Sequence, residues 1–239
     1  MTQETKELIL VVEDDFDIRN LIVLNLRRKG FDVIAAETGE EGLQLAKERN
    51  PLLMTLDLML PGIGGLDVCQ EIRSNTSTRD IYIIMVTALG EDDDRITGLQ
   101  VGADDYISKP FNIEELLLRV DAAVRRLKRN VHYATSDTVD TSVFSVGGLQ
   151  LNQDQHRIWI HGEEVSMTIT EYKLLLYLLQ HGENLCSRAE LLEKVWELPP
   201  NLNTRTVDTH IKRLRQKMGT LADNIETVRG AGYRFSKPV

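Results

Sequence analysis

Short apolar runs alternate with longer amphipathic segments along the first half of the chain. Five apolar runs predict β-strands, and apolar residues spaced three or four positions apart between them predict helices. This alternation implies right-handed crossovers and a doubly wound, five-stranded parallel α/β sheet of the flavodoxin-like type. The expected strands are 8–12, 32–36, 52–58, 81–87 and 105–107, and the expected helices are 16–29, 39–49, 65–75, 92–101 and 112–127.

The pattern changes in the second half of the chain. Strand-like pieces come first, three helical segments follow, and two β-rich runs around residues 230–232 form an expected terminal hairpin. Ser187 and Glu190 have the spacing of a capping box at the second helix. The order describes an α+β winged helix-turn-helix domain. Its expected helices are 170–181, 187–196 and 204–218.

Residues 128–143 separate the two patterns. A basic helix end is followed there by small polar residues, which are typical of an interdomain linker. A chain of 239 residues is long enough for two domains with separate cores. We therefore expect domains at 1–127 and 144–239.

The formal net charge of −9, taken alone, argues against a nucleic-acid partner. Residues 1–129 carry −8 of this charge, however, and residues 130–239 carry only −1. Residues 204–217 contain five basic residues and one acid, a local charge of +4. A local basic stripe matters more for DNA binding than the total charge does.

Cysteine content and hydropathy restrict the class of protein further. The two cysteines, Cys69 and Cys186, lie far apart, which excludes a disulfide framework or a cysteine-based zinc site. The apolar runs are too short to span a bilayer, and the first residues show no signal-peptide pattern. We expect a cytoplasmic protein without a membrane partner.

Acidic residues follow two expected strands of the first domain. If the first and third strands are neighbours, Glu13, Asp14 and Asp57 converge at the carboxyl edge of the sheet, where ligands of such sheets bind. Clustered carboxylates favour a cation, and oxygen ligands suit Mg²⁺. Thr87 ends the fourth expected strand and adds a hydroxyl, and Lys109 follows the fifth and adds a positive charge. The set suits phosphoryl transfer to Asp57, although acids after strands are also common as loop residues or helix caps.

Residues 7–127 resemble the receiver domain of two-component response regulators. The resemblance is carried by VVEDD, LDLMLPGIGG, VTA and GADDYISKPF, in this order. It implies phosphorylation of Asp57 by a partner histidine kinase. It also implies a Mg²⁺ site and a switch next to the phosphoryl group. The implied metal ligands are Glu13, Asp14, Asp57 and the carbonyl of Met59, and the implied phosphate-binding and switch residues are Thr87, Tyr106 and Lys109.

Charged residues are frequent between positions 92 and 127. In DNA-binding relatives of the receiver class, the resemblance implies, this face dimerises on phosphorylation. The alternative is a solvated charged face, in which each exposed pair contributes at most about 1 kcal/mol. The implied pairs between protomers are Arg95 with Glu115, Asp105 with Arg119, and Asp104 with Arg126.

The basic helix 204–218 is amphipathic. Val207, Ile211, Leu214 and Met218 form one apolar stripe, so the opposite side is free to lie in a major groove. A solvated surface helix is the alternative, but the basic hairpin downstream favours DNA. The residues expected opposite the stripe are Arg205, Thr209, Lys212, Arg213 and Gln216.

Residues 144–237 resemble the DNA-binding domain of OmpR/PhoB-type regulators. The motifs are TITEYKLLLYLL, SRAELLEKVW, TRTVDTHIKRLRQKM and IETVRGAGYRF. The resemblance implies that 187–196 positions the recognition helix 204–218 and that the loop 197–203 faces RNA polymerase. Trp159, Trp196 and Tyr233 are expected in the core. The expected DNA contacts are Arg205, Thr206, Thr209, His210, Lys212, Arg213, Arg215 and Arg229.

Together these features predict a transcriptional regulator rather than an enzyme. Phosphorylation at Asp57 would promote a homodimer that binds promoter DNA. Two alternatives stay open: a regulator that works without phosphorylation, and an aspartyl-phosphate phosphatase. Met59 argues against the second, because hydrolases with an aspartyl nucleophile of the haloacid dehalogenase type would carry an acid at that position.

Overall fold

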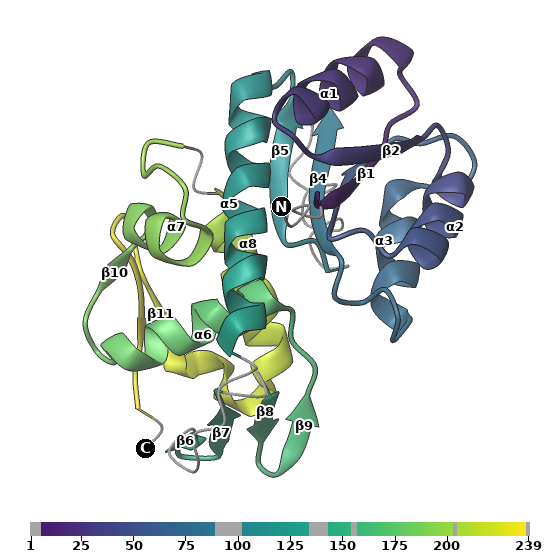
Figure 1. The fold of residues 1–239 in the computed structure, drawn as a ribbon. Helices are drawn as coiled ribbons and strands as arrows, with labels where there is room; N and C mark the ends of the chain where they lie inside the picture. The colour runs from purple at the N-terminus through teal and green to yellow at the C-terminus, as the bar shows by residue number, and fades with distance from the viewer. Residues whose placement is uncertain (1–5, 89–101, 134–142, 154–156, 203–204, 238–239) are drawn as a thin grey trace. The chain divides into compact units, whose positions relative to one another are not determined.

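The computed structural model describes residues 6–88, 102–133, 143–153, 157–202 and 205–237 (Figure 1). The chain divides into two compact units, one up to Val124 and one from Arg125 onward. Each unit has its own buried core, and the two are described separately.

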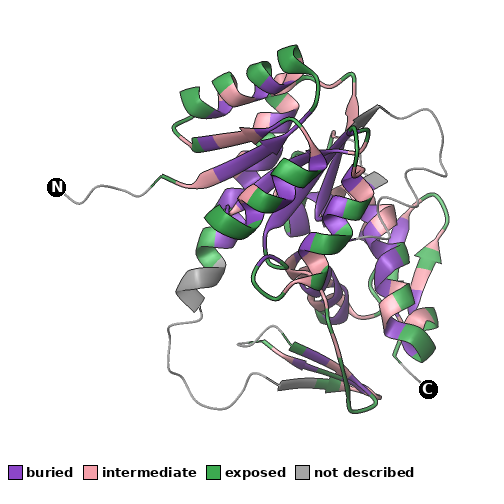
Figure 2. Ribbon diagram, turned by 90° about the vertical axis from the view of Figure 1, so that its right-hand side faces the viewer, coloured by how far each residue is buried: buried purple, intermediate pink, exposed green. Residues whose placement is uncertain are grey.

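A five-stranded parallel sheet forms the first unit, with the strand order β2-β1-β3-β4-β5. This is the doubly wound α/β fold that the alternating pattern predicted. The central strands are buried on both faces, as parallel strands between helices must be (Figure 2). The strands are β1 (Leu8–Val12), β2 (Asp32–Ala36), β3 (Leu53–Asp57), β4 (Tyr82–Ala88) and β5 (Asp105–Lys109).

Helices cover both faces of this sheet (Figure 1). Apolar side chains of α2 and α3 pack in one core cluster with β1, β3 and β4. On the other face, Lys29 at the end of α1 forms an ion pair of 2.8 Å with Asp121 of α5. The described helices are α1 (Phe16–Arg28), α2 (Gly39–Arg49), α3 (Gly65–Ser74) and α5 (Ile113–Tyr133).

Helix ends follow local chemistry. Asp15 caps α1, because its carboxylate accepts the amides of Asp17 and Ile18. The expected helix 92–101 lies outside the described residues. The expectation that the last helix of the first half ends at 127 is wrong, because the helix continues to Tyr133. No glycine or proline occurs between Pro110 and Gly147 to stop the helix earlier.

Strands, three helices and a hairpin form the second unit, as the second pattern predicted. A four-stranded antiparallel sheet, β6-β7-β8-β9, comes first. The helices follow, and a short 3₁₀-helix, η1 (Gly219–Asn224), leads into the hairpin of a three-stranded sheet, β10-β12-β11. The strands are β6 (Val143–Val146), β7 (Leu149–Asn152), β8 (Arg157–Ile160), β9 (Glu163–Val165), β10 (Cys186–Ser187), β11 (Ile225–Val228) and β12 (Gly232–Phe235), and the helices are α6 (Ile169–His181), α7 (Arg188–Trp196) and α8 (Arg205–Met218).

Short-range signals set the boundaries of this unit too. Ser187 and Glu190 form the expected capping box of α7, and Thr168 forms a second box at α6 with the side chain of its N3 residue. Gly230 turns the hairpin with φ +73°, and a Cβ on Gly232 would lie 2.0 Å from the carbonyl oxygen of Cys186. The close strand packing of β12 against β10 therefore requires glycine there.

The described part of the chain contains no helix that is both long and apolar enough to cross a membrane.

Candidate functional site

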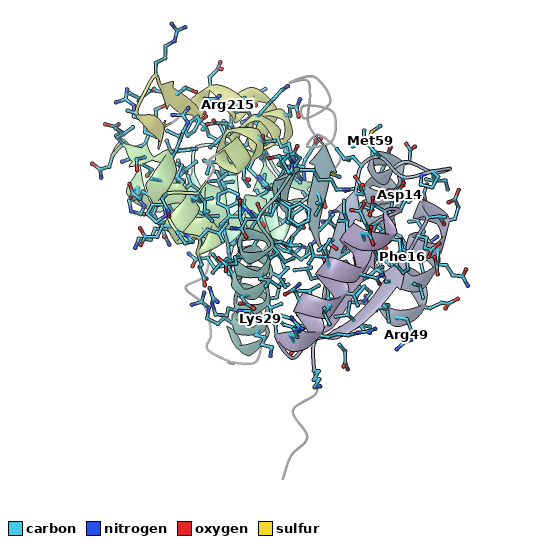
Figure 3. The ribbon with its side chains drawn as sticks, turned by 90° about the horizontal axis from the view of Figure 1, so that it is seen from above. Asp14, Phe16, Lys29, Arg49, Met59 and Arg215 are labelled. Atoms are coloured by element: carbon cyan, nitrogen blue, oxygen red, sulfur yellow. The ribbon has the colours of Figure 1, made fainter. Side chains whose placement is uncertain are left out.

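Three carboxylates meet at the carboxyl edge of the parallel sheet. Glu13 follows β1 and Asp57 ends β3, and these strands are hydrogen-bonded neighbours. One oxygen from each of Glu13, Asp14 and Asp57 lies within 4.8 Å of the others. Figure 3 labels Asp14 and Met59, which lie at this end of the unit. The structure thus brings together the acids that the sequence singled out.

Lys109, at the end of β5, joins two of these acids. Its Nζ lies 2.7 Å from Oε1 of Glu13 and 2.7 Å from Oδ2 of Asp57. Burial opposes the charge of the lysine, but its hydrogen bonds to Asp57 and Glu13 outweigh this and raise its pKa. The ammonium group therefore stays charged and offsets part of the negative charge of the pocket.

Glu13 is an acid of this pocket whose charged form is disfavoured in spite of its contact with Lys109. Burial, together with the charge of Asp57, raises the pKa of Glu13 to about 7, although Lys109 acts in the opposite direction. Oε2 of Glu13 is buried and has no hydrogen-bond partner among the described residues. A buried acceptor of this kind costs free energy unless a cation or donor reaches it. The pocket therefore fits a divalent cation held by oxygen ligands.

Asp57 itself is held in place from two sides. Its side chain is 3% exposed, and the amide of Met59 donates to Oδ1 at 3.1 Å while Lys109 contacts Oδ2. The Met59 side chain is exposed. The structure thus leaves this carboxylate next to a cation and at the rim of the unit, which are the conditions for a phosphoryl acceptor.

The two expected switch residues differ in what the structure shows of them. Thr87 lies in β4 opposite Ser108, and its side chain lies outside the described part of the structure. Tyr106 lies in β5 opposite Met85, and its side chain is 8% exposed. The tyrosine is therefore turned mainly into the core cluster of the first unit.

Charged residues of the predicted dimer face form pairs inside one chain. Nη1 of Arg119 lies 2.8 Å from Asp105, and Nη2 lies 2.7 Å from Glu115. The carboxylate of Asp104 accepts the amide of Ile83 and forms an ion pair of 2.6 Å with Arg73. Because these groups are largely buried, the reading of a solvated charged face does not fit them.

The remaining two residues of that face have different positions. Arg95 lies outside the described residues. Arg126 belongs to the second unit, is 4% exposed, and donates from Nη1 to the carbonyl of Val195 at 2.8 Å.

Sequence reasoning missed Arg19, which lies behind the acidic pocket. Its guanidinium donates to the carbonyls of both Glu13 and Asp14. The signal was present in the helical pattern, since Arg19 shares the buried face of α1 with Ile22 and Leu26. A charged residue on an apolar face indicates a buried partner.

The basic helix α8 of the second unit has the predicted apolar stripe. Val207, Ile211, Leu214 and Met218 are all at most 1% exposed. Lys212 and Gln216 are exposed and Thr209 is half-buried, so these residues lie toward solvent. The side chain of Arg205 lies outside the described part of the structure.

Three expected DNA contacts of α8 are directed into the domain instead. Arg213 is 2% exposed and forms an ion pair with Glu171 of α6, while Thr206 is 3% exposed. His210 is fully buried, donates from Nδ1 to the carbonyl of Thr206, and packs edge-on against Trp196. The buried side of α8 therefore includes polar residues beside the apolar stripe. Arg213 is among them because the buried carboxylate of Glu171 requires a cation. The prediction of surface contacts is corrected for these three side chains.

Arg215 and Arg229 lie at the hairpin. Nε of Arg215 donates to the carbonyl of Ile225 and Nη2 to Oγ1 of Thr227, so this arginine joins α8 to β11 (Figure 3). Arg229 is exposed where the hairpin turns. Trp196 and Tyr233 are 0% and 4% exposed, which confirms their expected place in the core. The same expectation is corrected for Trp159, which is only half-buried because it lies on the face of its sheet where its exposed neighbours Gln150 and Glu164 lie.

Comparison with known protein families agrees with this geometry. Residues 9–121 match the response regulator receiver domain, and residues 162–235 match the C-terminal domain of transcriptional regulatory proteins. The chain is thus a two-domain response regulator with a transcriptional regulatory output domain.

Relatives extend the match over the whole chain. The phosphate regulon transcriptional regulatory protein PhoB of Pseudomonas aeruginosa is 41% identical over 95% of this chain and 96% of its own length. The transcriptional regulatory protein ResD of Bacillus subtilis is 42% identical over 98% and 97%, respectively. The crystal structure of DrrB, an OmpR/PhoB homologue from Thermotoga maritima, is 29% identical, covers 97% of this chain and 100% of its own, and has a TM-score of 0.50. The chain belongs to the OmpR/PhoB family of response regulators.

Proposed function

We propose that this protein controls transcription in the cytoplasm by accepting a phosphoryl group on Asp57 from a histidine kinase. The observation that carries the proposal is the environment of Asp57, which is 3% exposed, adjoins Glu13 and Asp14, and contacts Lys109 at 2.7 Å. In the transfer, a carboxylate oxygen of Asp57 bonds to phosphorus while the bond from phosphorus to the kinase histidine breaks. The imidazole nitrogen leaves with the electron pair of that bond.

Each residue of the pocket has a role in this step. Glu13, Asp14, Asp57 and the carbonyl of Met59 would hold Mg²⁺, which would neutralise charge on the phosphoryl oxygens. Lys109 already contacts the acceptor carboxylate and would pair with the product. Thr87 and Tyr106 would report the modification, the first by contacting the phosphoryl group and the second by turning inward.

The output of the switch is a homodimer formed through the 92–127 face. Asp105, Glu115 and Arg119 already lie close together in one chain, so the dimer would exchange or share these ion pairs. Phosphorylation generally acts in this way: the added charge favours one of two conformations of the protein. The proposed interprotomer pairs are Arg95 with Glu115, Asp105 with Arg119, and Asp104 with Arg126.

The dimer would bind promoter DNA through α8 and the hairpin. The exposed side of α8 would enter the major groove, and Arg229 would contact the backbone or the minor groove. Two half-sites about one helical turn apart would match the two copies. The loop 197–203 would face RNA polymerase. The proposed DNA contacts are Arg205, Thr209, Lys212, Arg215 and Arg229.

Beryllofluoride or acetyl phosphate with Mg²⁺ tests the proposal. The wild type should form one adduct, Asp57→Ala none, and Asp32→Asn, which changes an exposed acid on β2, one adduct as in the wild type. Selection of bound genomic fragments should recover specific sites, and modification should tighten binding only where Asp57 is present. An adduct on Asp57→Ala equal to that on wild type would refute the mechanism. Specific binding that modification never changes would support a phosphorylation-independent regulator.

A further inference from the structure

Arg19 is a cation on the inward face of α1. The residue is 7% exposed and lies among apolar neighbours of the same helix face. A buried guanidinium is expensive unless its donors are satisfied, so the groups that satisfy it are informative.

Backbone carbonyls of the acidic loop accept both hydrogen bonds that Nη1 of this guanidinium donates. Nη1 of Arg19 lies 2.7 Å from the carbonyl oxygen of Glu13 and 3.0 Å from that of Asp14. Nη2 forms an ion pair of 2.6 Å with Glu37, which follows β2. One side chain therefore links α1 to the loops that follow two neighbouring strands.

These bonds set the directions of the acidic side chains. Because both carbonyls point toward the guanidinium, the peptide planes on either side of Asp14 are held in place. Asp15 is held separately, since its carboxylate caps α1. Of three consecutive acids, only Glu13 and Asp14 are left to place an oxygen near Asp57.

We propose that Arg19 is a positioning residue for the divalent-cation site: it fixes the Glu13 and Asp14 carboxylates in the geometry that the cation requires. The inference rests on the proposed function, because that function requires the cation. Loss of a residue that orients metal ligands typically weakens metal binding by about 10- to 100-fold. Arg19→Met keeps much of the side-chain length and removes every donor, so we expect a loss in this range.

Arg73 offers a matched control. It is also a largely buried arginine, with a side chain 13% exposed, and it also donates to backbone carbonyls. Its carbonyl acceptors belong to Arg79, Ile81 and Gly102, however, its ion pair is with Asp104, and none of these lies in the acidic loop. Arg73→Met should therefore destabilise the fold in a similar way without changing the affinity for the cation.

The test is calorimetric titration of the full-length, unphosphorylated chain with MgCl₂, with urea unfolding of each variant in parallel. We expect Arg19→Met to raise the Kd for Mg²⁺ at least about tenfold. Arg19→Lys should restore part of the affinity, because an ammonium group still donates to a carbonyl. Arg73→Met should leave the Kd within about twofold of the wild-type value.

Two results would overturn the inference: a wild-type Kd in Arg19→Met, or equal losses in Arg19→Met and Arg73→Met. Either leaves the proposed function intact if the wild type binds Mg²⁺ and forms its Asp57 adduct. A wild type that neither binds Mg²⁺ nor forms the adduct refutes both. If Arg19→Met does not fold, Arg19→Lys decides the matter, because an unchanged Kd refutes the inference and an intermediate loss supports it.

Discussion

The guanidinium of Arg213 lies 2.9 Å from the carboxylate of Glu171, and both side chains are buried. Nζ of Lys217 reaches the other oxygen of the same carboxylate at 2.6 Å. Burial alone would raise the pKa of Glu171, but the two cations outweigh it and lower the pKa to about 2. An ion-pair network, as well as apolar packing, therefore attaches α8 to α6.

Removing the acid of this network should destabilise the second unit strongly. Glu171→Gln leaves Arg213 buried without its counterion, and breaking such a pair costs about 3–5 kcal/mol. Urea unfolding of the wild type and the variant measures the difference. Replacing both partners, as in Glu171→Leu with Arg213→Met, should cost less than the sum of the single changes. Additive costs would show that the two residues do not interact.

The same carboxylate should make stability depend on pH below neutrality. Its pKa is lowered from 4.5 to about 2 on folding, so its contribution is complete above pH 4.5 and is lost as the pH falls toward 2. A shift of this size corresponds to about 3 kcal/mol. The difference in unfolding free energy between wild type and Glu171→Gln should therefore shrink from pH 6 to pH 3. A difference that stays constant would contradict the lowered pKa.

Tyr233 should couple the hairpin to α8. Its hydroxyl donates to Asp208 of α8 and lies 3.2 Å from Arg188 of α7, whose guanidinium also packs over the tyrosine ring. Tyr233→Phe should lower stability by about 1 kcal/mol and weaken specific DNA binding, because the hairpin loses one of its connections to α8. Fluorescence anisotropy with a selected duplex measures the second effect.

Tyr177→Phe is the control for that change. The Tyr177 hydroxyl also donates to a carboxylate, that of Glu190 at 2.9 Å, but it does not involve the hairpin. A similar loss of stability with unchanged DNA affinity is expected. If both variants lose the same DNA affinity, general destabilisation rather than the hairpin connection explains the effect.

Lys212 should contribute to DNA binding through charge. It is exposed on the side of α8 away from the core, where Gln216 is exposed too. The logarithm of the DNA affinity falls as the logarithm of the salt concentration rises. If Lys212 contacts one phosphate, Lys212→Ala should make this slope less negative by about 1. Gln216→Ala should leave that slope unchanged. Equal slopes for Lys212→Ala and the wild type would remove Lys212 from the DNA interface.

Short-range sequence patterns predicted those features of the structure that depend on neighbouring residues alone. The strands 8–12 and 32–36 have the bounds that their apolar runs predicted, and the Ser187 capping box forms as its spacing indicated. The acids at strand ends could be placed together because neighbouring parallel strands end at one edge. These inferences needed only strand order and short-range periodicity.

Partners distant in sequence could not be read in the same way. Helical periodicity placed Arg213 toward solvent, but buried Glu171, 42 positions earlier, draws it inward. Arg19 likewise takes its role from carbonyl groups that no residue pattern reveals. For Arg213 a tertiary contact decided which side of the helix the residue faces, and for Arg19 tertiary contacts decided which groups satisfy it.

The three consecutive acids 13–15 have two different roles, because the third caps the N-terminus of α1 and the first two lie in the pocket. Asp15 serves the helix, so a residue with another capping side chain, such as serine, can replace it with little loss, whereas serine in place of Asp14 removes a charge from the pocket. An alignment of this chain that slips by one position would exchange a structural residue for a functional one while every letter still reads as acidic.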